Sequence, residues 1–184
     1  MRPTCLASET SLIVVTDIHG APEPELCFSS SLPVTARLSL GDLCNQPALS
    51  GEALHHHLFQ DGGMRQAVAA LRDRLTDQRH LIGLGYSAGG TALWKAVQAG
   101  ASLAGLICVS STRLRDEPAL PIPTQAYFGD NDPGRPTDKW LATVPDMATV
   151  LPNAAHAFYA EAGHPRRAKV ESEIALIFSR WNAV

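Results

Sequence analysis

Short apolar runs recur along the chain and predict the strands of a sheet. Several are nearly continuous in apolar residues, without the alternation of apolar and polar positions that marks a half-exposed strand. Such runs are typical of parallel strands that are covered on both faces. We expect strands at Leu12–Thr16, Val34–Leu40, Leu81–Tyr86, Leu103–Val109, Thr124–Phe128 and Thr149–Leu151.

Segments with helical periodicity separate these runs. Apolar residues recur three or four positions apart between Met64 and Leu75, and charged residues fill the other face. Residues 88–99 are apolar almost all round, which predicts a central helix. A stripe that ends at Trp181 predicts a last helix opening at Gly163-His164-Pro165, because proline suits a first helical turn.

Strands that alternate with helices predict an α/β fold. We expect a mostly parallel sheet of about six strands, with helices on both faces. The length of 184 residues suits a single domain over 1–184. No insertion is long enough for a large cap domain.

The overall charge argues against polyanionic partners. The chain has 15 basic and 18 acidic residues, a net charge of −3. It has no basic cluster of the kind that nucleic acid or an anionic membrane requires, so we expect neither partner. The apolar stretch near the N-terminus is too short for a membrane span and lacks a signal-peptide cleavage pattern, so a cytoplasmic location is expected.

The cysteines and clustered histidines do not predict a metal site. The cysteines are widely scattered without a CxxC pair, which favours neither zinc nor disulfides; they are Cys5, Cys27, Cys44 and Cys108. Cys108 is expected to be an inert buried thiol. The run His55-His56-His57 is expected on a partly exposed loop or short helix, because adjacent residues do not converge on one ion.

The segment HLIGLGYSAGGTALW carries the strongest chemical signal. Residues 85–89 fit G-x-S-x-G between a predicted strand and a predicted helix, which is the context of a nucleophile elbow. Ser87 at such a turn needs small neighbours, and the following helix directs its positive N-terminal end at the reaction centre. A phosphate-binding loop is disfavoured because no Gly-Lys-Ser/Thr follows.

A nucleophilic serine needs a base and an acid that orients the base. Asp132 follows the strand predicted at 124–128, and His156 follows the strand predicted at 149–151. The order Ser87, Asp132, His156 is the order expected for an elbow of this kind. Asp130 competes with Asp132 as the acid, and His164 competes with His156 as the base.

The early segment TDIHG offers a different chemistry. Asp17, His19 and Asp42 have the types and spacing with which a two-metal phosphoesterase begins. Two ions would require further Asn and His ligands, and neither a Gly-Asn-His-Asp/Glu segment nor a Gly-His-x-His segment occurs. We therefore expect no metal, and keep a metal-dependent phosphoesterase only as an alternative.

These motifs together resemble the compact dienelactone hydrolase-like branch of the α/β-hydrolase superfamily, which includes small esterases and thioesterases. The similarity lies in Asp17-Ile18-His19-Gly20, in Gly85 to Gly90, in Gly129 to Asp132 and in His156-Ala157-Phe158, and it spans residues 11–180. The dienelactone enzymes use cysteine at the position of Ser87, so their lactone substrate is not carried over.

The resemblance implies a serine hydrolase of small-molecule esters or thioesters that needs no cofactor. It places the oxyanion hole at the backbone amides of Ile18 and Ala88. Asp17 would help to order the site, and substrate contacts are expected from Asp17, His19, Tyr86 and Arg113. A non-catalytic ligand-binding protein of the same fold remains an alternative.

Arg113 and Arg115 follow the predicted strand that ends at Val109. Ligands of open α/β folds bind at this edge of the sheet, so the two arginines would either hold a substrate carboxylate or lie on a solvated loop. The sequence does not decide between ester, thioester, lactone and peptide substrates, and it does not give the oligomeric state.

Overall fold

The fold is built on one parallel sheet. A computed structural model describes residues 10–20, 27–78 and 80–182. Every adjacent pair of strands is parallel, and the order is β2-β1-β3-β4-β5-β6. The strands are β1 (Ser11–Val15), β2 (Val34–Leu38), β3 (Leu81–Tyr86), β4 (Gly105–Val109), β5 (Thr124–Gly129) and β6 (Met147–Leu151). The predicted α/β fold and the number of strands are confirmed.

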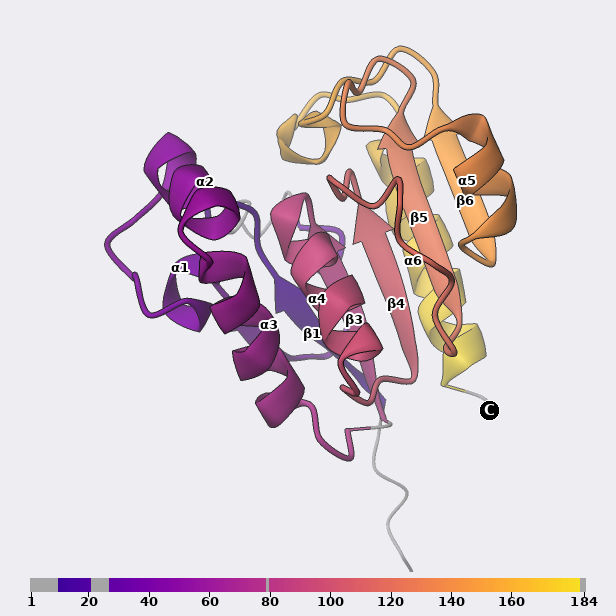
Figure 1. The fold of residues 1–184 in the computed structure, drawn as a ribbon. Coiled ribbons are helices and arrows are strands. Elements are labelled where there is room, and N and C mark those ends of the chain that lie inside the picture. The colour runs from indigo at the N-terminus through magenta and orange to yellow at the C-terminus, as the bar shows by residue number, and fades with distance from the viewer. Residues whose placement is uncertain (1–9, 21–26, 79, 183–184) are drawn as a thin grey trace, which may run out of the picture.

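Helices cover both faces of this sheet (Figure 1). The helices that pack on one face are α1 (Leu40–Leu43), α2 (Gly51–Gln60), α3 (Gly63–Arg74), α4 (Ala88–Gln98) and α5 (Asp138–Thr143). The opposite face is covered by α6 (Arg167–Trp181) and by the short 3-10 turn η2 (Phe158–Ala160). In the described part of the chain no segment forms a large cap over the strand ends.

Two apolar cores follow from the alternation of side chains along each strand. In β1, Ile13 and Val15 face the helices α1–α5, whereas Leu12 and Val14 face α6. Helix α4 is apolar almost all round because it packs between the sheet and its neighbours. Its Trp94 is fully buried, and the ring centroid lies 5.6 Å from that of Trp140 in α5.

Several predicted boundaries were wrong. The second strand stops at Leu38, not Leu40, because the hydroxyl of Ser39 accepts the backbone N–H of Asp42 at 3.0 Å and starts α1. The fourth begins at Gly105 and the sixth at Met147. The last helix begins at Arg167, and not at Gly163-His164-Pro165, which lie in the turns before it.

The histidine run lies in α2, where His55 has a different partner from His56 and His57. The ring of His55 packs on Phe59, with centroids 4.8 Å apart. His56 and His57 instead place Nδ1 at 3.3 and 3.7 Å from a carboxylate oxygen of Asp61. The three rings therefore do not form one ligand set.

The cysteines of the described segments are free and buried. Burial raises the pKa of the Cys108 thiol to about 12, so this side chain stays protonated and inert at neutral pH. Cys5 lies outside the described residues. Among those residues, no helix combines the length and the apolar character needed to cross a lipid bilayer.

Successive strands are added first on one side of β1 and then on the other. From β1 the chain moves to the edge strand β2, and then returns to form β3 on the other side of β1. Open α/β sheets bind ligands at the carboxyl ends of the strands beside such a reversal. The segments that follow β1, β3, β4, β5 and β6 all begin at this edge of the sheet.

Truncating an internal leucine of β3 should destabilise the protein far more than truncating a surface leucine. Leu84 is fully buried, whereas Leu176 on α6 is 57% exposed. We expect Leu84→Ala to lower the free energy of unfolding by about 2–5 kcal/mol, because it leaves a cavity in the core. Leu176→Ala should cost less than about 0.5 kcal/mol. Urea denaturation followed by tryptophan fluorescence measures both, and equal losses would contradict the packing described.

Candidate active site

Ser87 lies on a sharp turn between β3 and α4. Its backbone has φ 48° and ψ −121°, a conformation that side-chain-bearing residues rarely adopt. Such strain persists only where the surrounding structure holds it. The backbone N–H of Ser87 donates to the carbonyl oxygen of Val109 at 2.8 Å, which fixes the turn to the end of β4.

The glycines around Ser87 allow backbone segments to approach closely. A Cβ on Gly85 would lie 2.3 Å from the Cα of Gly90. A Cβ on Gly89 would lie 2.4 Å from the carbonyl oxygen of Thr16, at the end of β1. Because neither backbone can move away cheaply, the G-x-S-x-G-G spacing has a steric origin here.

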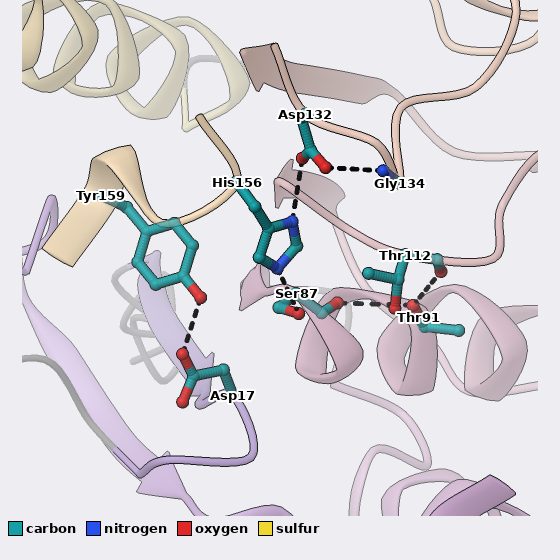
Figure 2. A network of polar contacts seen from close by, with 8 residues as sticks. All are labelled: Asp17, Ser87, Thr91, Thr112, Asp132, Gly134, His156 and Tyr159. Carbon is teal, nitrogen blue, oxygen red and sulfur yellow. Dashed lines mark hydrogen bonds and ion pairs between the residues drawn. The ribbon is translucent and has the colours of Figure 1, made fainter. Parts of the chain in front are cut away.

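The structure brings Ser87, His156 and Asp132 into one chain of hydrogen bonds (Figure 2). The Oγ of Ser87 lies 3.0 Å from Nε2 of His156, and Nδ1 of His156 lies 2.9 Å from Oδ2 of Asp132. An ionised carboxylate only accepts hydrogen bonds, so the imidazole proton belongs on Nδ1. Nε2 of the neutral ring is then free to accept the hydroxyl proton of Ser87.

The two competing aspartates have different surroundings. The Asp132 side chain is fully buried, and its Oδ1 accepts the backbone N–H of Gly134 at 2.7 Å. Asp130 is exposed and accepts the backbone N–H of Ala154 at 3.2 Å. Backbone hydrogen bonds, first that of Asn153, lower the pKa of Asp130. Of these two carboxylates, that of Asp132 forms the hydrogen bond with the imidazole of His156.

The competing histidine is elsewhere. His164 is buried in the turn before α6, where its ring centroid lies 5.7 Å from that of Phe158. Its Nδ1 accepts the backbone N–H of Arg166 at 3.3 Å. His156, by contrast, follows β6 and reaches the carboxyl edge of the sheet, as its place in the sequence predicts.

A cavity of about 700 Å³ opens beside Ser87. Ile18 and Ala88, whose amides were predicted as oxyanion donors, both line it. Ala88 is the first residue of α4, so its N–H has no acceptor within the helix. The remaining wall comes from α2, from the loop after β4 and from the loop after β5; it includes His55, Phe59, Thr112, Arg113, Arg115, Asp116, Pro133 and Gly134.

Asp17 connects the loop after β1 to the loop that carries His156. Its Oδ1 accepts the backbone N–H of His19 at 2.7 Å, and its Oδ2 accepts the hydroxyl of Tyr159 at 2.6 Å (Figure 2). Burial and the charge of Asp17 raise the pKa of Tyr159, which therefore remains a neutral donor. Sequence reasoning missed Tyr159, although it follows His156 by three residues.

Of the four predicted substrate contacts, only Arg113 lines the large cavity. Tyr86 does not, and this expectation is corrected: its side chain is fully buried on the α6 face, where the hydroxyl accepts the N–H of Phe28 at 3.0 Å. Strand alternation directs Tyr86 away from the side on which Ser87 opens. Asp17 and His19 line a separate hollow of about 170 Å³ beside α1.

Asp17 and Asp42, which were considered as ligands of a two-metal centre, form hydrogen bonds with different partners. Both oxygens of Asp17 accept hydrogen bonds from Tyr159 and from the His19 backbone. Oδ2 of Asp42 accepts the hydroxyl of Ser39 at 2.7 Å, at the start of α1. Within 10–20, 27–78 and 80–182, no group of three or more His, Cys, Asp or Glu side chains is arranged to hold an ion.

Comparison with known proteins identifies the fold. No protein-family description and no curated protein sequence matches the chain. Among solved structures, a protein from Klebsiella pneumoniae assigned as a dienelactone hydrolase is similar with a TM-score of 0.67, at 20% identity over 96% of this chain and 88% of that one.

Two further structures are hydrolases of the same architecture. A protein from Pectobacterium atrosepticum assigned as a YdeN-like hydrolase gives a TM-score of 0.65, at 18% identity over 94% of this chain and 92% of its own. RedJ, a thioesterase of prodiginine biosynthesis in Streptomyces coelicolor, gives 0.59, at 14% identity over 91% and 90%. The chain thus has the α/β-hydrolase fold of these structures.

A methyl group at Gly85 should disrupt the turn that carries Ser87. We expect Gly85→Ala to lower the free energy of unfolding by at least about 1–3 kcal/mol, since the new Cβ meets backbone rather than a flexible side chain. Gly163→Ala is the matched control, because no atom lies within 4 Å of a Cβ at that position. Thermal and urea denaturation of both variants measure the difference. An unchanged stability of Gly85→Ala would show that the turn is not packed as described.

Proposed function

We propose that this protein is a serine hydrolase that cleaves a carboxylic ester or thioester of a small molecule through an acyl-enzyme intermediate. The observation that carries the proposal is the uninterrupted hydrogen-bond chain from Ser87 through His156 to Asp132. It lies at the wall of a cavity large enough for a small substrate. The same three residue types perform acyl transfer on unrelated folds.

Acylation begins with proton transfer. Nε2 of His156 takes the hydroxyl proton as Oγ of Ser87 attacks the substrate carbonyl carbon, and the carbonyl electron pair moves onto its oxygen. The buried carboxylate of Asp132 holds the ring and stabilises the imidazolium that forms. The intermediate collapses, the bond to the leaving oxygen or sulfur breaks, and His156 returns the proton to that atom.

Deacylation repeats the sequence with water. His156 removes a proton from a water molecule that attacks the acyl carbon, and the released proton returns to Oγ of Ser87. The products are a carboxylic acid and an alcohol or thiol. Every proton is carried by His156, so this scheme requires no metal or organic cofactor.

The developing negative charge is met by the amides of Ile18 and Ala88. Ala88 is fixed by α4, whereas Ile18 lies on the loop between Asp17 and His19. Because Asp17 accepts from both the His19 backbone and Tyr159, it restrains the peptide units on either side of Ile18. Preorganised donors of this kind cost no rearrangement when charge develops, which is why they lower the barrier.

A fluorophosphonate probe tests the activated serine. Wild type should be labelled, and Ser87→Ala should not, because the attacking oxygen is gone. Asp132→Asn should be labelled at least about 100-fold more slowly, since the base loses its orientation. Asp130→Asn is the matched control and should react at close to the wild-type rate, because asparagine keeps the oxygen that caps Ala154.

Mass spectrometry of the intact protein follows this labelling, and hydrolysis of p-nitrophenyl butyrate gives turnover. Folded wild type that neither reacts with the probe nor hydrolyses the ester would overturn the proposal. Ligand binding that is equal in wild type and Ser87→Ala, without turnover, would then identify a binding protein of this fold.

Removing the hydroxyl of Tyr159 should slow the chemical step. We expect Tyr159→Phe to lower kcat by about 10- to 100-fold with little change in KM, because the oxyanion loop loses its anchor while the cavity keeps its shape. Tyr127→Phe is the control: this buried tyrosine lies on the α6 face, away from the cavity. Steady-state kinetics separate kcat from KM, and an unchanged kcat in Tyr159→Phe would show that Asp17 positions the loop alone.

A further inference from the structure

We propose that the cavity selects substrates carrying a negatively charged oxyanion group remote from the scissile bond, and that Arg113 and Arg115 bind this group. The inference rests on the proposed hydrolase function and adds the substrate class. Both arginines line the same 700 Å³ cavity as Ser87 and His156. They belong to the loop that follows β4, whereas the hydrogen-bonded chain comes from the turns after β3, β5 and β6.

The loop that carries the arginines is anchored to the helix of the nucleophile. The hydroxyl of Thr91, in the first turn of α4, donates to the carbonyl oxygen of Thr112 at 2.5 Å (Figure 2). Arg113 follows directly and has φ 59°, a left-handed conformation that is uncommon for a residue with a long side chain. The anchored Thr112 therefore fixes where the backbone of Arg113 begins, at the wall of the cavity.

The Arg113 side chain is further placed by an aromatic surface. Its guanidinium carbon lies 4.2 Å from the centroid of the Phe59 ring, and the other partner of Phe59 is His55 in the same helix. Stacking occupies the face of the guanidinium and leaves the N–H groups at its edge free to donate. An oriented arginine of this kind suits two parallel hydrogen bonds to a carboxylate or phosphate.

The charge on this wall is not neutralised within the described structure. Some cationic side chains have acidic partners, such as Lys95 with Glu117 and Arg135 with Asp138. No carboxylate of the described residues forms an ion pair with Arg113 or Arg115. Asp116 is the one acid at this wall besides Asp132, whose oxygens already accept from His156 and Gly134. Of the charged side chains exposed at this wall, two are positive and one is negative, because the carboxylate of Asp132 is fully buried beside His156. This exposed excess of positive charge favours an anion.

Two kinds of substrate would supply the group. One is a half-ester whose acyl part ends in a carboxylate, and the other is a thioester whose thiol part carries a phosphate. Two matched pairs of substrates distinguish them. The first pair is the p-nitrophenyl half-ester of glutaric acid and p-nitrophenyl hexanoate. The second pair is butyryl-phosphopantetheine and butyryl-pantetheine.

The measured quantity is the ratio of kcat/KM for the charged and uncharged members of each pair. Wild type should prefer the charged member in at least one pair. Arg113→Gln and Arg115→Gln should each reduce that ratio by about tenfold, mainly through the charged substrate, as expected for one lost charge-assisted contact. Asp116→Asn should raise the ratio, and added salt should lower it. Arg74→Gln, an exposed arginine on α3, is the control and should leave it unchanged.

A wild-type preference for the uncharged member in both pairs would overturn the inference, as would a charged-substrate preference that survives in both arginine variants. In either case labelling of Ser87 would continue, which separates this failure from that of the proposed function. If Ser87 does not react and none of the four substrates is hydrolysed, both the proposed function and this inference are wrong. The pair that shows the preference identifies the group as carboxylate or phosphate.

Discussion

The strained turn at Ser87 is the constraint on which the rest of the site depends. Its positive-φ backbone places Ser87 at the wall of the cavity at the carboxyl edge of the sheet, but the turn requires glycine where α4 passes β3 and the end of β1. The contacts at Gly85 and Gly89 bring the loop after β1 within reach of the same point. His156 and Asp132 follow β6 and β5, which are neighbours in the parallel sheet. Both residues therefore lie at the same edge of the sheet as Ser87.

Much of this arrangement is local in sequence, and it could be predicted for that reason. A strand, a glycine-flanked serine and a helix occupy 18 consecutive positions in the order that an elbow requires, from Leu81 to Gln98. Parallel topology explains why residues after successive strands meet, so the proximity of Asp132 and His156 to Ser87 could be predicted from their positions after β5 and β6. To distinguish Asp132 from Asp130, and His156 from His164, requires the directions of their side chains. Neither spacing nor composition provides these directions.

The remaining features depend on tertiary contacts. The bond between Asp17 and Tyr159 joins residues 142 positions apart, and no periodicity signals it. Tyr86 is next to Ser87 in sequence, yet its side chain faces α6, because neighbours on a strand point to opposite faces. The contact of Arg113 with Phe59 joins the loop after β4 to α2. From the sequence, the first was considered a possible solvated loop and the second a loop or short helix. Helix α6 begins after the turns at 163–166, where His164 is buried with its ring centroid 5.7 Å from that of Phe158.

The position of Tyr159 makes two halves of the site cooperative. One short segment, ending in η2, supplies both the imidazole of His156 and the hydroxyl that restrains Asp17. A displacement of this whole segment would move the imidazole away from Ser87 and free the carboxylate of Asp17 in the same step. On the proposed function, loss of the base and loss of the restraint on the loop that carries Ile18 would therefore be coupled.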